Sequence, residues 1–169
     1  MLFRSVAGAF ELLLYDAGYQ VIPTGIERSL RELRSVDRDR YIKLAHPRLR
    51  TTPDCFVLDL EGGNSWLTEV KYRRYMSERL LKGLEEIRQT WSPYVLVLVL
   101  AEPPEEWTGD VSHIRAFEID ERTDLTLKYL LEDGSRLQDV FVRLKERRKN
   151  GTILSVQEAI KRLVVQEHD

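Results

Sequence analysis

The feature of this sequence that most constrains its fold is an uninterrupted apolar run over residues 94–100 (YVLVLVL). The run lacks the alternation of apolar and polar residues that marks a strand with one wet face. It is typical of a strand buried on both faces of a sheet. Such a sheet needs covering layers on both sides, so the run predicts an α/β fold.

The segments around this run supply the rest of the predicted sheet and its covering helices. Apolar residues at helical spacing predict helices over residues 4–17 and 77–91. Short β-type segments flank them. The resulting order is helix, strand, hairpin, helix, strand, strand, which predicts a mixed sheet flanked by helices. The predicted strands cover residues 19–22, 54–60, 65–71, 94–100 and 111–119.

The last fifty residues predict an extension that packs on this core. Residues 125–131 suggest a strand that ends at an Asp133–Gly134 turn, and residues 137–144 have helical spacing. Ser155 followed by Glu158 is a capping box for a last helix. No linker composition separates these parts. The 169 residues therefore predict one domain, with its core at about residues 5–119 and its extension at about 120–169.

Composition narrows the functional classes. The net charge of −2 gives no overall attraction to nucleic acid or membrane, so a polyanion site would have to be a local patch. Cys55 is the single cysteine, and with three scattered histidines it argues against a structural zinc site. No apolar run is long enough to span a bilayer. We therefore expect a cytoplasmic protein without a membrane partner.

A glycine pair predicts a hairpin in the middle of the chain. Gly62 and Gly63 lie between the β-type segments 54–60 and 65–71. Turn positions in tight hairpins often need positive φ, which glycine adopts without strain. A turn centred on these glycines would place Asp54 opposite Lys71.

Three charged side chains then share one face of the hairpin. Strand side chains alternate between faces, so Asp54, Glu69 and Lys71 should gather at one end of it. Opposed residues there are about 5 Å apart and diagonal ones about 7–8 Å. Two carboxylates this close must share a cation, or one must hold a proton. Mg²⁺, which prefers carboxylate and carbonyl oxygens, would suit the pair, and Mn²⁺ should substitute.

These residues also carry a family resemblance. Residues 52–54 (Thr-Pro-Asp) and 67–71 (Leu-Thr-Glu-Val-Lys) resemble the two halves of the PD-(D/E)XK nuclease motif. The predicted element order over residues 5–101 is similar to the restriction-endonuclease-like core of that superfamily. In layout it looks closest to archaeal Holliday-junction resolvases and small restriction-like nucleases.

The resemblance implies a Mg²⁺-dependent endonuclease that hydrolyses DNA phosphodiester bonds. By matching, Asp54 and Glu69 would bind the metal, the backbone of Val70 would add a carbonyl, and Lys71 would be catalytic. Many family members add an acid on the first helix, and Glu11 is the candidate here. Some relatives place a glutamine on the helix after the motif, which suggests Gln89 as a supporting polar residue.

Local positive charge suggests where a nucleic acid would bind. Residues 28–50 hold eight basic and three acidic side chains, a local net charge of +5. Arginines of this segment would contact phosphates if it lies near Lys71. Two further arginines directly follow the motif and could hold the scissile strand. The candidates are Arg31, Arg34, Arg38, Arg73 and Arg74.

Other interpretations of the same residues stay open. Asp54 and Lys71 could form a structural ion pair, with Glu69 bonded to an arginine. The basic segment could be a solvated surface. The fold could also bind nucleic acid or a protein partner without cutting, and RNA is a further candidate substrate. Cutting both strands of a duplex would suit a two-fold homodimer, although no seam is readable in the sequence.

Overall fold

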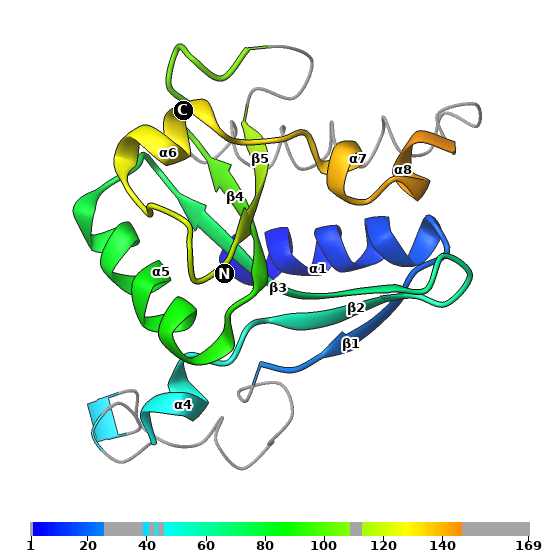
Figure 1. Cartoon of the computed structure of the whole chain (residues 1–169), viewed down its shortest axis with the longest axis horizontal. Helices are drawn as coiled ribbons and strands as arrows, with labels where there is room; N and C mark the ends of the chain where they lie inside the picture. The colour runs from blue at the N-terminus through cyan, green and yellow to red at the C-terminus, as the bar shows by residue number, and fades with distance from the viewer. Residues whose placement is uncertain (1, 26–38, 41–42, 44–45, 109–112, 147–169) are drawn as a thin grey trace.

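The computed structural model of the protein describes residues 2–25, 39–40, 43, 46–108 and 113–146 (Figure 1). Five strands form one sheet in the order β1-β2-β3-β4-β5. Strands β3 and β4 run parallel, and each of the other neighbouring pairs is antiparallel. The strands are β1 (Gln20–Pro23), β2 (Cys55–Asp59), β3 (Asn64–Arg73), β4 (Tyr94–Leu100) and β5 (Ile114–Ile119).

Both faces of the sheet are covered, as the apolar run predicts. All seven residues of β4 are buried, because its side chains alternate between two separate hydrophobic clusters. Helix α1 (Leu2–Asp16) covers one face, together with α7 (Leu137–Val140) and α8 (Arg143–Glu146). Helix α5 (Glu78–Trp91) and α6 (Leu127–Glu132) cover the other face. Figure 1 shows α1 and α5 on opposite sides of the sheet.

Helix α5 makes the crossover between the parallel strands β3 and β4. Its N-terminus is capped by Ser77, whose hydroxyl accepts a hydrogen bond from the Leu80 backbone N–H at 3.3 Å. Leu80, Leu84 and Ile87 are buried against the sheet. This confirms the predicted helix and its apolar stripe, and it fixes where β3 ends and α5 begins.

The C-terminal extension differs from the prediction. Residues 127–132 form helix α6 where a strand was expected over 125–131. The Thr126 hydroxyl caps this helix at 3.2 Å from the Tyr129 backbone N–H, and Leu130 is buried in the cluster beside α5. The predicted helix over 137–144 is instead two short helices, α7 and α8. The capping box at Ser155 lies outside the described residues.

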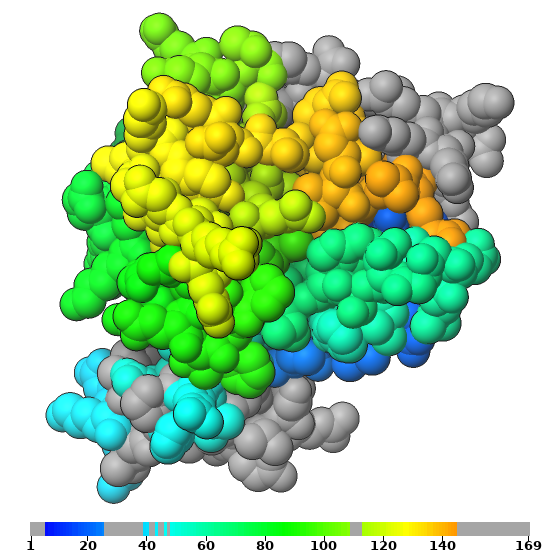
Figure 2. Space-filling model, viewed as in Figure 1, coloured from blue at the N-terminus to red at the C-terminus, as the bar shows by residue number. Residues whose placement is uncertain are grey.

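The described part of the extension, which ends at residue 146, packs on the core. Phe141 and Leu144 are buried in the same cluster as α1, and Ser135 bridges to Ala116 of β5. Figure 2 shows α8, in orange, against the β2–β3 hairpin, in turquoise. Within the described part of the chain, no helix has the length and apolar character needed to cross a membrane.

Candidate metal and phosphate site

The observed register of the β2–β3 hairpin corrects the predicted pairing. Cys55 pairs with Thr68 and Asp59 with Asn64, so the turn covers residues 60–63. It is therefore centred one residue earlier than the glycine pair. Continuing the register by one residue places Asp54 opposite Glu69, whereas the sequence predicted Lys71 opposite Asp54. The pairing shifts by two residues, which is one full period of side-chain alternation, so the predicted shared face is retained.

Asp54 lies directly before β2 and is fixed by hydrogen bonds from two segments. Its carboxylate Oδ2 accepts a hydrogen bond from the Val70 backbone N–H at 2.8 Å. Its backbone carbonyl accepts from the N–H groups of Thr24 and Gly25 at 3.0 and 3.2 Å. The Thr24 hydroxyl donates to the Pro53 carbonyl at 2.7 Å. The carboxylate is therefore positioned just before the start of β2, beside Val70 of β3.

Glu69 is a buried carboxyl group beside Asp54. Only 4% of the residue is exposed, and its carboxylate forms an ion pair with the Lys71 ammonium on the same strand face. The pKa of Glu69 is raised to about 7, mainly by burial; the positive charge of Lys71 opposes this shift, and the negative charge of Asp54 adds to it. The structural alternative expected Glu69 to bond with an arginine, whereas the ion pair of Glu69 is with Lys71.

The backbone of Val70 offers a third oxygen on the same side. In a strand, the N–H and C=O of one residue point toward the same neighbouring strand. Because the Val70 N–H reaches Asp54, its carbonyl also points to the β2 side, beyond the last β2 pair at Cys55. The Arg73 carbonyl points the other way and accepts from Ala101 at 3.0 Å, as the alternation requires.

This set of donors fits a hard divalent cation. Two carboxylates and one carbonyl are the oxygen ligands that Mg²⁺ and Mn²⁺ prefer, and such ions usually keep several waters. Because burial raises the pKa of Glu69 to about 7, its ionised form needs additional positive charge nearby. A cation bound by Asp54 and Glu69 would supply that charge.

Other predicted site residues do not join this pair. Among the described residues, no three His, Cys, Asp or Glu side chains are grouped closely enough to hold a metal ion. Glu11, half-buried on α1, therefore makes no triad with Asp54 and Glu69. Gln89 is exposed and donates to Glu85 at 3.4 Å, away from the site. Arg31, Arg34 and Arg38 lie outside the described residues.

The two arginines after the motif have different environments. Arg73 has the same parity on β3 as Glu69 and Lys71. Loss of solvent lowers the pKa of Arg73, and the negative charge of Glu69 opposes this shift. Arg74 is exposed and forms an ion pair with Glu102, with Nε and Oε1 2.7 Å apart. Arg79, in the first turn of α5, also affects the pKa of Arg73. Sequence analysis missed Arg79, because only the β3–α5 connection brings it to Arg73.

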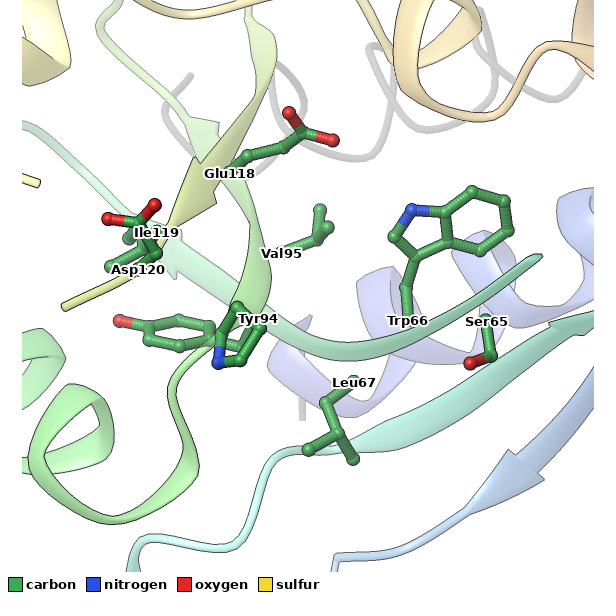
Figure 3. Close-up of a pocket in the computed structure, with 9 residues that line it drawn as sticks. Ser65, Trp66, Leu67, Tyr94, Val95, Glu118, Ile119 and Asp120 are labelled. Carbon is green, nitrogen blue, oxygen red and sulfur yellow. The ribbon is translucent and has the colours of Figure 1, made fainter. Parts of the chain in front are cut away.

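A hollow of about 310 Å³ lies at the opposite end of β3 (Figure 3). Leu67 and Trp66 line it from β3 and point in opposite directions there. Leu67 precedes Glu69 by two residues, so this hollow adjoins the candidate site. Its lining residues are Ser65, Trp66, Leu67, Pro93, Tyr94, Val95, Glu118, Ile119 and Asp120.

Compared with protein families, with curated proteins and with solved structures, the chain matches none. The functional argument therefore depends on the geometry of this site and on the sequence motif.

Proposed function

We propose that this protein is a metal-dependent endonuclease that hydrolyses DNA phosphodiester bonds. The observation that carries the proposal is the grouping of Asp54, Glu69 and Lys71 on one face, with Glu69 buried and its pKa raised to about 7. Perturbed carboxyl groups of this kind are typical of sites that bind a cation or move a proton.

The element order supports the same proposal. Helix α1 is followed by three antiparallel strands, with the short helix α4 (Pro47–Arg50) between the first two, then by α5, and then by β4 parallel to β3. The PD-(D/E)XK resemblance implies a core of this order, with its acids on the second and third strands. Asp54 directly precedes the second strand here, and Glu69 and Lys71 lie on the third.

Each residue has a separate task in the proposed reaction. Asp54 and Glu69 would hold Mg²⁺ with the Val70 carbonyl, and the Val70 N–H orients the Asp54 carboxylate. Bound Mg²⁺ polarises a phosphoryl oxygen and lowers the pKa of a coordinated water. Lys71 lies beside the acids with 22% of its side chain exposed. Its ammonium can orient the attacking water or offset negative charge that develops on the phosphate.

A cleavage panel tests this proposal. Wild-type protein is incubated with duplex, single-stranded, flap and four-way junction DNA, and with matching RNA, in Mg²⁺ or Mn²⁺. We expect cleavage of at least one DNA substrate, inhibition by EDTA, and loss of cleavage in Lys71→Ala. Asp59→Asn, which alters a buried acid at the far end of the hairpin, is the matched control and should still cut.

The same panel decides between cleavage and binding alone. If wild-type and Lys71→Ala bind alike and neither cuts any substrate, the endonuclease proposal is rejected. The nuclease-fold module that binds without cutting would then be the better account. Cleavage of RNA alone would reject DNA as the substrate and retain the chemistry.

A further inference from the structure

The electrostatic environment changes along β3, from one side of the candidate site to the other. Before Glu69, this face of the strand carries Leu67, which packs against the apolar cluster beside α5. After Lys71, the same face carries Arg73, about 7 Å further along the strand. A polyanionic strand that places one phosphate at Lys71 would be attracted toward this second end.

Two guanidinium groups lie together at that second end. Arg73 and Arg79 are both exposed, and Arg79 is close enough that its charge lowers the pKa of Arg73, although loss of solvent around the guanidinium is the larger cause. Arg73 donates to the Tyr72 carbonyl at 2.7 Å. Within the described residues, neither guanidinium takes part in an ion pair, and the negative charge of Glu69 opposes only part of the shift that burial and Arg79 cause in the pKa of Arg73.

The neighbouring arginine shows that such compensation is available nearby. Arg74 follows Arg73 directly, lies just beyond the end of β3, and is neutralised by Glu102 at 2.7 Å. An arginine close to the site can therefore still have an acidic partner. The two arginines toward the site are the ones that could accept an external anion, and α5 adds the partial positive charge of its N-terminus.

We propose that Arg73 and Arg79 form a second phosphate subsite that binds the phosphodiester next to the scissile one on the same nucleic-acid strand. The subsite rests on the proposed function for the position of the scissile phosphate beside Lys71. It assigns a specific role to Arg79, and it separates Arg73 from Arg74. It also gives the substrate a direction: the cut strand runs from Lys71 toward the start of α5.

The test compares two double variants that each remove two positive charges. Arg73→Gln with Arg79→Gln removes the proposed subsite. Arg74→Gln with Lys128→Gln removes an ion-paired arginine and an exposed lysine of α6. Binding of a fluorescent oligonucleotide is measured in EDTA over a range of salt concentrations. The subsite variant should bind about tenfold more weakly, and its salt slope should flatten by about 0.9 for each lost duplex contact.

A substrate with one uncharged linkage locates the subsite. A methylphosphonate is placed in turn at each position flanking the cleaved bond of the substrate that wild-type cuts best. In wild-type, the neutral linkage next to the scissile phosphate should raise KM several-fold with little change in kcat. In the subsite variant, the same linkage should have no further effect, because the guanidinium partners are already absent.

The outcomes separate this inference from the proposed function. Equal salt slopes in the two double variants, or an undiminished methylphosphonate effect in the subsite variant, would overturn the subsite even if the protein cuts. A wild-type protein that binds without cutting, with a flattened slope only in the subsite variant, would keep the subsite and reject the endonuclease. If wild-type does not bind any oligonucleotide, the subsite is rejected as well.

Discussion

Two buried acids at opposite ends of the β2–β3 hairpin have opposite electrostatic environments. Asp59 and Glu69 are each 4% exposed. The Asp59 Oδ1 accepts from the Gly62 backbone N–H at 2.9 Å and from Arg143 Nε at 2.8 Å. These interactions hold the pKa of Asp59 below its usual value, with the Gly62 hydrogen bond as the largest cause. The pKa of Glu69 is instead raised to about 7.

The difference shows which acid is structural. Asp59 links the hairpin turn to α8 through Arg143. Arg143 also contacts Glu61 of the turn, with Nη1 and Oε2 2.9 Å apart. A Cβ at Gly62 would collide with the Asp59 carboxylate, so glycine is required there for this close approach. Glu69 has a second acid as its neighbour, and the Lys71 ammonium only partly opposes the rise of its pKa. A pair of neighbouring acids costs stability, and proteins retain such a cost where function benefits from it. The Glu69 end of the hairpin is therefore the candidate functional end.

The largest expected effect is on catalysis. Glu69→Gln should lose at least about 100-fold in metal-dependent cleavage, because general acid–base and metal contributions are of that order. Asp59→Asn, assayed well below its melting temperature, should cut at nearly the wild-type rate. Initial rates on the best DNA substrate give the measurement. Equal losses in the two variants would remove the functional distinction between the acids.

The second expected effect is on stability and has the opposite pattern. Arg143→Ala should lower the melting temperature by several degrees, because it leaves the buried Asp59 carboxylate without its cation. Asp54→Asn, measured in EDTA, should melt at or above the wild-type temperature, because it relieves the repulsion between Asp54 and Glu69.

Thermal unfolding by circular dichroism distinguishes these results. A marked drop for Asp54→Asn in EDTA, with no Mg²⁺ effect on wild-type, would favour a purely structural pair at this site.

The third expected effect is a pH dependence from Glu69. The pKa of Glu69 is about 7 in the folded protein and near its ordinary value of 4.5 in the unfolded chain. The native state therefore binds more protons between these values, and metal-free stability should fall as pH rises from about 4.5 to 7. The loss from this group should be about 2–3 kcal/mol at most.

Urea unfolding in EDTA at several pH values measures this slope. Glu69→Gln, which does not titrate, provides the reference, and the difference between the two proteins isolates Glu69. A difference that is constant from pH 4.5 to 7, or that grows in favour of wild-type, would contradict the raised pKa.

The smallest expected effect is the response to metal. At tenfold excess over its Kd, Mg²⁺ should stabilise wild-type by about 1.4 kcal/mol and Asp54→Asn by less. Binding at pH 6.5 should also release protons, because the cation favours ionised Glu69. Calorimetry in two buffers of different ionisation enthalpy detects this release. Equal heats in both buffers would mean that Glu69 is already ionised or is not a ligand.

The sequence by itself determined the layers of the fold and the shared face of the site. The apolar run of β4 requires a sheet covered on both sides, and alternation with a period of two puts Glu69 and Lys71 on one face. The face shared with Asp54 is retained despite the change in register, because a shift of two residues preserves it. The buried strand and the shared face both follow from local periodicity, which can be read from a short segment of sequence.

Only the tertiary structure decided the partners of these residues. The residue opposite Asp54 depends on the position of the turn. The turn follows Asp59, whose carboxylate accepts hydrogen bonds from the Gly62 N–H and from Arg143, 84 residues away in the sequence. Residues 127–132 form a helix because Leu130 is buried there, between α5 and the indole of Trp107. Burial of Glu69 and the approach of Arg79 to Arg73 likewise depend on contacts between separate elements, which the order of residues does not contain.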